Sequence, residues 1–340
     1  MHDSTCNKPL AKPKKTWYTI RWPKIRKKPP EGRKNKAMLD IVLPGTGGTT
    51  PRADRHLSCA YLRYNGNGIL VDCGEGTQIA VKKAGFSIGK IGMILLTHFH
   101  ADHCSGLPGL LLTMGNEGRR EKVKIYGPKG VGEIVKALTI IAPELPFSIE
   151  CIPLSDFDSF SWQGVDVTAF EVHHTGTCFG YDFRVRRGGK FDKEKAEKNN
   201  VPMKFWRALQ NGQAVEDNGV TYTPDMVLGE SRRGLHVTYA TDTRPCDIIS
   251  TMAYDADLMV LEGMFGVMSK ENRAKETCHM TIPEAARLAR EAEAKKLWLT
   301  HFSPSEPTPH EYENDARKIF PETEIADDGM MMTLRFPEDA

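Results

Sequence analysis

The pattern H-x-H-x-D-H at residues 98–103 concentrates potential metal ligands in one short segment, namely His98, His100, Asp102 and His103. The segment follows an apolar stretch that we expect to be a β-strand. Imidazole and carboxylate groups are typical ligands of zinc and similar divalent ions, and a tight turn at a strand end can bring them together. Without a metal, such crowded polar groups would be poorly compensated. The pattern therefore predicts a metal centre.

Other expected strands also end beside a potential ligand. These ligands are His173 or His174, Asp242 and His301, each shortly after an apolar stretch. One loop cannot fill the four positions around each of two zinc ions, so several strand ends must contribute. Strand ends that share one edge would bring these side chains together. The carboxylate of Asp242 could bridge two ions roughly 3.5 to 4 Å apart, the spacing of two-metal hydrolases.

Further motifs carry a resemblance to a known family. They are D-C-G-E-G-T-Q at 72–78, Y-G-P-K-G at 126–130, F-G-Y at 179–181 and D-T-R-P at 242–245. With the histidine pattern, they resemble ribonuclease Z, the tRNA 3′-processing endonuclease of the metallo-β-lactamase superfamily. The similarity runs from Leu39 to Phe336. It implies an α/β fold, an αββα four-layer sandwich of two mixed sheets covered by helices, with an inserted arm.

The resemblance also implies a ligand set for two zinc ions per chain, with manganese or iron as alternatives. The set is His98, His100 and His174 for one ion, Asp102, His103 and His301 for the other, and Asp242 as the bridge. His174 is chosen over His173 because its distance to the F-G-Y motif matches the family.

For catalysis, the resemblance implies that a metal-bridging hydroxide attacks phosphorus in an RNA phosphodiester. Asp102 would accept the proton of the water, and His279 would protonate the leaving ribose 3′-oxygen. A positioned general acid of this kind contributes roughly 10²- to 10⁴-fold. Asp72 matches a family aspartate that orients a ligand histidine, and Glu262 could orient His279.

Charge separates an N-terminal segment from the rest of the chain. Residues 1–37 contain twelve lysines and arginines against Asp3 and Glu31, a net charge of +10, whereas the whole chain carries +2. We expect 1–37 to be a basic, partly disordered extension, either solvated or in contact with RNA phosphates. Residues 38–340 should form the catalytic domain, and the polar segment at about 186–234 its substrate-binding arm.

Helix signals are clearest in two places. Thr281 and Glu284 form a capping-box pattern with Pro283 in the first turn, which predicts a helix start. A charged segment at 191–209 inside the arm also predicts helix.

Partners and location follow from the resemblance and from missing signals. No apolar run of about 18 residues and no signal-peptide pattern occurs, so we expect a cytoplasmic protein without membrane contact. Its partner would be a tRNA precursor or another RNA, with Arg52, Arg55 and Lys129 as candidate phosphate contacts. The resemblance also implies a homodimer.

Two other functions stay open. The arm tip lacks the Pro-Pro-Gly-Pro turn of bacterial relatives, and the loop 51–56 keeps only the proline and final arginine of the family pattern. A related hydrolase of small substrates, such as a cyclic nucleotide phosphodiesterase or lactonase, is one alternative. A non-catalytic RNA-binding protein with structural metals is another. The long polar arm argues against the first, and a ligand set without cysteine argues against the second.

Overall fold

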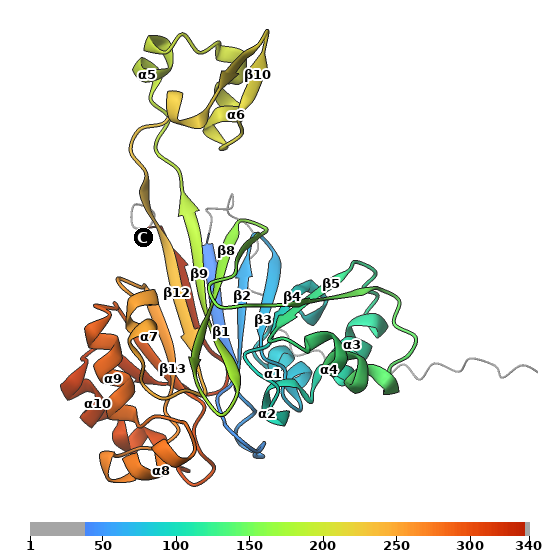
Figure 1. The fold of residues 1–340 in the computed structure, drawn as a ribbon, viewed down its shortest axis with the longest axis vertical. Coiled ribbons are helices and arrows are strands. Elements are labelled where there is room, and N and C mark those ends of the chain that lie inside the picture. The colour runs from blue at the N-terminus through green and yellow to red at the C-terminus, as the bar shows by residue number, and fades with distance from the viewer. Residues whose placement is uncertain (1–37, 337–340) are drawn as a thin grey trace, which may run out of the picture. The chain divides into compact units, whose positions relative to one another are not determined.

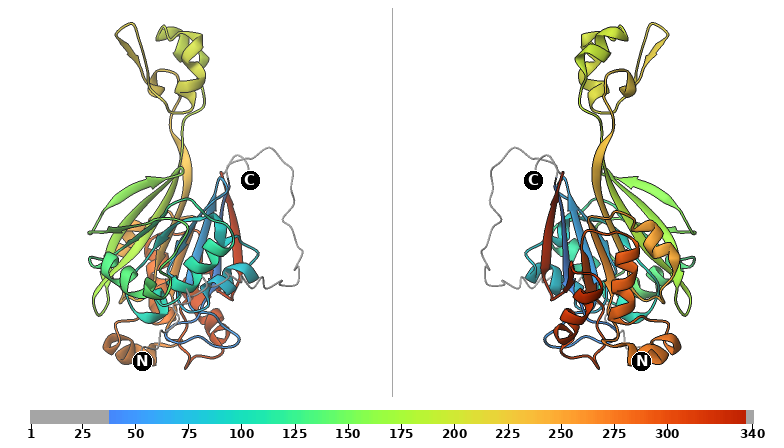
Figure 2. Two further views of the ribbon diagram at one scale, coloured as in Figure 1. Left: turned by 90° about the vertical axis from the view of Figure 1, so that its right-hand side faces the viewer. Right: turned by 90° about the vertical axis from the view of Figure 1, so that its left-hand side faces the viewer.

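Two β-sheets face each other at the centre of this computed structural model, which describes residues 38–336 (Figure 1). The predicted extension 1–37 lies outside the described residues. Within the described range, each of the two large sheets has seven strands. Helices lie on both outer sides, as the side views also show (Figure 2). The predicted αββα arrangement of two mixed sheets is confirmed.

The first sheet contains the N-terminal strands and the last strand of the described chain. Its order is β16 (Met330–Arg335), β1 (Met38–Gly45), β2 (Cys59–Tyr64), β3 (Asn67–Val71), β4 (Ile91–Leu95), β5 (Val123–Gly127) and β6 (Ile149–Pro153). The strands from β3 to β6 run parallel, and the others are antiparallel. A tight turn at Asn65 and Gly66, both with positive φ, joins β2 to β3 as a hairpin.

The second sheet is also mixed. Its order is β15 (Thr323–Ile325), β14 (Leu297–Thr300), β13 (Leu258–Glu262), β12 (Arg232–Ala240), β9 (Thr177–Arg187), β8 (Val165–His173) and β7 (Ser159–Trp162). The strands from β12 to β15 are parallel, whereas β9 pairs antiparallel with both β8 and β12.

Helices cover the outer face of each sheet. Those against the first sheet are α1 (Thr77–Lys83), α2 (Ala101–Cys104), α3 (Leu107–Asn116) and α4 (Val131–Leu138). Those against the second sheet are α7 (Asp247–Met252), α9 (Ile282–Glu291) and α10 (Glu313–Ile319). The short α8 (Glu271–Glu276) packs through Ala274 in a separate small cluster with Met264 and Phe265. Short 3-10 turns are η1 (Ile88–Lys90), η2 (Thr139–Ile141), η3 (Met203–Phe205), η4 (Pro224–Met226), η5 (Met268–Lys270) and η6 (Pro309–Tyr312).

Apolar side chains fill three layers between these elements. Alternate residues of facing strands, such as Leu39, Ile41, Tyr181 and Phe183, form the core between the sheets. Separate clusters lie between each sheet and its helices. Since a strand buried on both faces needs apolar residues at nearly every position, β4 and β13 are buried throughout. This burial holds the ends of the central strands in fixed positions.

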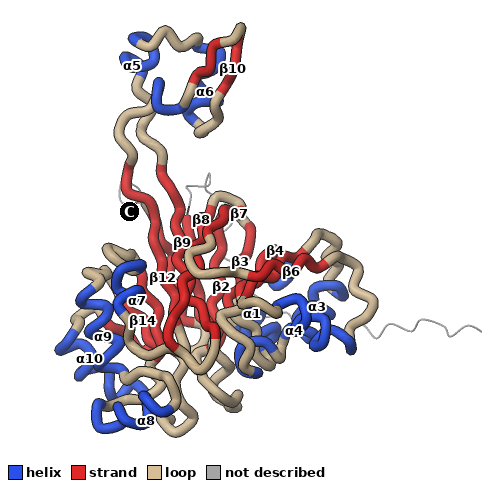
Figure 3. Tube along the Cα trace, in the orientation of Figure 1, coloured by secondary structure: helices blue, strands red, loops and turns tan. Residues whose placement is uncertain are grey.

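The segment between β9 and β12 has a small apolar core of its own. It contains α5 (Lys193–Lys198), α6 (Trp206–Gln210) and the hairpin of β10 (Val215–Asp217) and β11 (Val220–Tyr222) (Figure 3). Ala196, Leu209 and Val227 are fully buried there. This local core allows the segment to keep its structure beyond the sheet.

The helical segment predicted at 191–209 is interrupted by a turn. The chain forms α5 and α6 separated by a turn. Asn200 has a left-handed φ of 52°, and Pro202 cannot donate a backbone hydrogen bond, so a helix cannot continue through these positions. The sequence also gave no indication of β7, of the β10–β11 hairpin or of β15.

The F-G-Y motif at 179–181 has a packing role. Gly180 lies opposite Phe170 across the β8–β9 ladder, and a Cβ atom at this position would collide with the Phe170 ring. The buried Tyr181 hydroxyl donates to the carbonyl oxygen of Leu96 at 2.6 Å. This bond ties the second sheet to the first sheet two residues before His98.

We therefore expect Gly180→Ala to destabilise the fold. Overpacking a core typically costs ~1–3 kcal/mol, so urea denaturation should show a loss of about 2 kcal/mol. Gly132→Ala is the matched control, because Gly132 lies in α4 and its added Cβ would meet its nearest neighbour at 3.9 Å. That change should stabilise by about 0.5 kcal/mol. The same effect from both changes would contradict the packing argument.

Candidate metal centre

Loops at the ends of strands from both sheets meet at one edge of the sandwich. His98, His100, Asp102 and His103 follow β4, whereas His174, Asp242 and His301 follow β8, β12 and β14. Their side-chain nitrogen and oxygen atoms form groups in which all potential ligand atoms lie within 4.8 Å of one another. The three main groups are His98, His100 and His174; Asp102, His103 and His301; and His98, His103 and Asp242.

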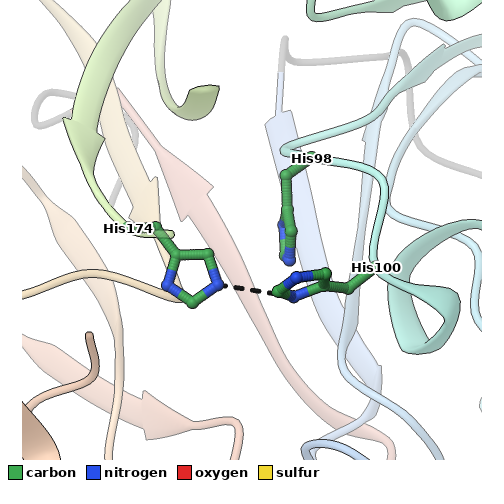
Figure 4. A group of neighbouring side chains, drawn as sticks. All are labelled: His98, His100 and His174. Atoms are coloured by element: carbon green, nitrogen blue, oxygen red, sulfur yellow. Dashed lines mark hydrogen bonds between the residues drawn. The ribbon is translucent and has the colours of Figure 1, made fainter. Parts of the chain in front are cut away.

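The first group consists of three imidazoles that face one another (Figure 4). His174 Nε2 lies 3.4 Å from His100 Nδ1, and the ring centroids of His98 and His100 are 4.5 Å apart. His173, the neighbour of His174, is exposed and belongs to none of the groups found among the described residues.

The second group is more deeply buried. His103 Nε2 and His301 Nε2 lie 3.3 Å apart, and Asp102 Oδ2 is 3.4 Å from the former and 3.5 Å from the latter. Burial alone would raise the pKa of the Asp102 carboxyl, but the neighbouring imidazoles of His103 and His301 hold it well below its ordinary value. Asp102 is therefore ionised at neutral pH.

Asp242 lies between the two groups. Its Oδ1 is 4.0 Å from His98 Nε2, and its Oδ2 is 3.2 Å from His103 Nε2 and 3.3 Å from His301 Nε2. Despite complete burial, the neighbouring imidazoles hold the pKa of this carboxyl well below its ordinary value. Each oxygen of one carboxylate thus faces a different group of nitrogens.

Some buried polar atoms of this cluster have no hydrogen-bond partner among the described residues. Among the described residues, His98 Nε2 and Asp242 Oδ2 are buried and have no hydrogen-bond partner. A buried polar atom without a partner costs about 1–3 kcal/mol. Nitrogen lone pairs that face each other at 3.3 Å, as in His103 and His301, also repel unless a proton or cation lies between them. The donor set is nitrogen and oxygen without thiolate, which fits divalent metal ions such as zinc.

Asp72 fixes the orientation of His103. It is fully buried, and its Oδ2 accepts a hydrogen bond from His103 Nδ1 at 2.8 Å. Its Oδ1 accepts from the backbone N–H of Thr97 at 2.8 Å. With the proton of His103 on Nδ1, its Nε2 presents a lone pair to the cluster.

Two other imidazoles are oriented in the same way. His174 Nδ1 donates to the carbonyl oxygen of Cys278 at 3.1 Å. His98 Nδ1 lies 3.0 Å from Thr97 Oγ1, and this hydroxyl itself contacts Asp72. The Nε2 atoms of His98 and His174 are therefore also left as acceptors toward the cluster.

Several site residues have an unusual backbone conformation. Asp72, Asp242 and His301 have left-handed φ values of 61°, 56° and 56°. Non-glycine residues seldom adopt this conformation, and such positions are concentrated at functional sites. Each of these residues turns the chain sharply after a parallel strand, which directs its side chain toward the shared edge.

His279 lies at one side of the cluster and is held by Glu262. The fully buried Glu262 carboxylate accepts from His279 Nδ1 at 3.1 Å and from the backbone N–H of Thr243 at 2.6 Å. Burial would lower the pKa of His279, but the Glu262 carboxylate raises it to about 9. The imidazole is therefore protonated at neutral pH and can donate a proton.

Arg244 fixes the backbone at His279. Its guanidinium donates to the carbonyl oxygen of His279 and to Glu284 Oε1, each at 2.5 Å. Glu284 in turn accepts from the backbone N–H of Thr281 at 2.8 Å and completes the capping box at the start of α9. The helix signal seen in the sequence thus also positions a candidate catalytic residue.

The three arginine and lysine side chains expected to contact phosphate lie in different surroundings. Arg55 donates to the hydroxyl of Thr46 and to the carbonyl oxygen of Ala326, and its side chain is 13% exposed. It fixes the loop after β1, whereas Arg52 forms an ion pair with Asp54. Lys129 is exposed on the wall of a cavity that His98 and His100 also line.

Comparisons with known proteins agree with this geometry. Ribonuclease Z of Lachnospira eligens is 49% identical over 303 residues, which cover 89% of this chain and 100% of the relative. Ribonuclease Z of Agathobacter rectalis is 48% identical with the same coverage. A family model described as "Anti-Pycsar protein Apyc1" matches residues 39–187.

Solved structures show the same fold. The crystal structure of human tRNase Z, short form, matches with a TM-score of 0.62 and 26% identity, covering 88% of this chain and 99% of that one. The metallo-β-lactamase fold protein YhfI from Bacillus subtilis matches with a TM-score of 0.64 and 20% identity, covering 88% of this chain and 100% of that one.

We expect Asp72→Asn to lower the affinity for divalent metal about 10- to 100-fold, the usual cost of losing a carboxylate that orients a ligand histidine. Asparagine tolerates the left-handed backbone at this position, so the fold should be retained. Competition with a chelating dye measures the affinity, and Asp54→Asn, on the exposed loop, is the control. Unchanged metal affinity in Asp72→Asn would limit Asp72 to a structural role at the strand end.

Proposed function

The chain belongs to the ribonuclease Z family, and from this premise we propose that it is a dinuclear zinc endonuclease that removes 3′ trailers from tRNA precursors. The observation that carries the proposal is the shared cluster of seven donor side chains from both sheets, with His279 held beside it by the Glu262 carboxylate. A structural metal site needs no such proton donor.

Two zinc ions are the proposed cofactor. We assign His98, His100 and His174 to one ion, Asp102, His103 and His301 to the other, and Asp242 to both. When bound, such ions lower the pKa of a coordinated water and neutralise charge on the phosphate.

The catalytic steps assigned to the chain itself are proton transfers. The oxygen of a water molecule forms a bond to phosphorus, and the bond between phosphorus and the ribose O3′ breaks. Asp102, ionised at neutral pH, accepts the proton of the water, and His279 donates a proton to O3′. The products are a tRNA with a 3′-hydroxyl and a trailer with a 5′-phosphate.

The segment between β9 and β12 is the proposed substrate-binding arm. Strand β12 has nine residues, and its far end, Arg232, carries the arm, whereas Asp242 follows its other end. At ~3.3 Å per residue, the arm begins about 30 Å from the metal centre. A contact so far from the scissile bond suits a large folded RNA such as a tRNA precursor.

Three further features remain predictions. They are the homodimer implied by the family resemblance, the cytoplasmic location expected from missing targeting signals, and the contact with RNA that the charge of residues 1–37 would allow. Within residues 38–336, no helix has the length and apolar character needed to cross a membrane.

A phosphodiesterase of small substrates is the second candidate. One fold can carry different hydrolytic activities, and the match to the family model described as "Anti-Pycsar protein Apyc1" ends at residue 187. It therefore concerns the first half of the metal-binding fold and leaves out the arm.

Deleting the arm separates the two candidates. Arg187 and Arg232 are cross-strand partners, so residues 189–230 can be replaced by a short Gly-Asn-Gly turn that closes the hairpin. We expect cleavage of a 3′-extended tRNA precursor, mapped at nucleotide resolution, to fall at least about 100-fold, as expected when more than about 2.7 kcal/mol of substrate binding is lost. Hydrolysis of bis(p-nitrophenyl) phosphate by the same variant is the control for an intact metal centre and should persist. Full cleavage of the precursor without the arm would contradict the tRNA proposal.

The role of His279 can be tested with two leaving groups. His279→Ala should slow cleavage of the RNA precursor about 10²- to 10⁴-fold, because the ribose O3′ needs a proton to leave. Hydrolysis of bis(p-nitrophenyl) phosphate should slow far less, since nitrophenolate leaves without protonation. His173→Ala, on a neighbouring exposed residue, is the control. Equal losses with both substrates would exclude His279 as the general acid.

A further inference from the structure

Two cavities adjoin the metal centre and share His100. The first, of about 380 Å³, is lined by Asp102, Asp242, His279 and His301, with Arg273 at its wall. The second, of about 330 Å³, is lined by His98, Phe99, Pro128, Lys129 and residues 175–177. Only the first contains the proposed general acid, so the two cavities are not equivalent with respect to the scissile phosphate.

The second cavity combines groups that suit a nucleotide. The partly buried ring of Phe99 packs beside Gly130 at the start of α4, so it is a fixed aromatic wall. The exposed Lys129 is next to it, and the exposed Thr175 and Thr177 lie on the turn between β8 and β9. Aromatic rings stack on bases of any sequence, and lysines neutralise phosphates, so such a combination binds single-stranded RNA with little sequence preference.

The position of His279 determines which side of the scissile phosphate lies in the first cavity. If His279 protonates O3′, the nucleotide that carries O3′ must lie in the first cavity, within hydrogen-bond distance of this imidazole. The strand on the other side of the phosphorus, attached through O5′, must then leave the metal centre by another route. The second cavity borders the metal centre at His98 and His100 and lacks His279.

We propose that the second cavity is the subsite for the first trailer nucleotides, in which Phe99 stacks on a base and Lys129 contacts a trailer phosphate. The inference rests on the proposed function, because a trailer exists only if the chain cleaves a 3′-extended RNA. Because stacking and phosphate contacts tolerate any base, the subsite would accept the varied trailer sequences of different precursors. The 5′-phosphorylated trailer product would also compete with new substrate at this subsite.

Binding of two ligands to the metal-loaded full chain tests the subsite. One ligand is a 5′-phosphorylated oligouridine labelled at its 3′ end, which represents the trailer, and the other is a trailer-free tRNA. Lys129→Ala should raise the dissociation constant of the oligouridine about tenfold, the effect of losing one hydrogen bond to a charged group. The same variant should change the dissociation constant of the trailer-free tRNA less than about twofold. Phe99→Leu keeps an apolar side chain against the core but removes the aromatic ring. It should raise the dissociation constant of the oligouridine to a similar extent and leave that of the trailer-free tRNA unchanged.

Lys136→Ala is the matched control for charge. Lys136 is exposed on α4, and Lys129 is exposed just before this helix, but Lys136 does not line the cavity. The loss of Lys136 should therefore leave both affinities unchanged. Arg273→Ala, in the first cavity, should weaken binding of the trailer-free tRNA and leave binding of the oligouridine unchanged. The proposed subsite would be contradicted if Lys129→Ala left binding of the oligouridine unchanged, or if Lys129→Ala weakened the trailer-free tRNA complex and Arg273→Ala weakened the oligouridine complex. Failure of the wild-type protein to cleave any tRNA precursor would instead contradict the proposed function.

Discussion

The structure depends on one electrostatic constraint: buried nitrogen and oxygen atoms converge at a strand-end edge without enough hydrogen-bond partners among themselves. His103 Nε2 and His301 Nε2 face each other at 3.3 Å, and both oxygens of Asp242 face imidazole nitrogens. A proton can relieve one facing pair of nitrogens, whereas a divalent cation accepts electron pairs from several nitrogen and carboxylate donors at once. Hydrogen bonds that the imidazoles donate to Asp72, Thr97 and the Cys278 carbonyl hold the rings in this unfavourable arrangement. The protein therefore maintains the site in a form that is stabilised when metal binds.

The sandwich supplies the rigidity that this constraint requires. Parallel strands buried on both faces end at the same edge, and residues with left-handed φ after them turn the ligands inward. Family motifs outside the ligand set serve the same purpose. Gly180 allows close packing against Phe170, and Arg244 joins the backbone of His279 to the first turn of α9. Remote motifs thus affect chemistry by fixing the positions of a few side chains.

The strand ends and the ligand types could be predicted from the residues, because metal chemistry restricts residue types and buried strands need apolar runs. The H-x-H-x-D-H pattern and the capping box at Thr281 are such signals. The arrangement of the sheets and the division of the ligands between two ions came only from the family resemblance. Contacts made by backbone groups could not be predicted, because they do not depend on the residue type. An example is the hydrogen bond from the Thr49 N–H to Asp102 Oδ2 at 2.8 Å. The edge strand β7 was missed because its alternate residues are exposed and polar. The turn at Asn200 inside the helical segment of the arm was missed because charge composition does not reveal it.

Counting the bound metal ions tests the central claim most directly. Elemental analysis of the purified protein, combined with anomalous diffraction at the zinc edge, measures how many ions bind per chain and where they lie. We expect two zinc ions per chain, with Asp242 contacting both. A single ion, or ions bound outside the cluster formed by His98, His103, His174, Asp242 and His301, would contradict it.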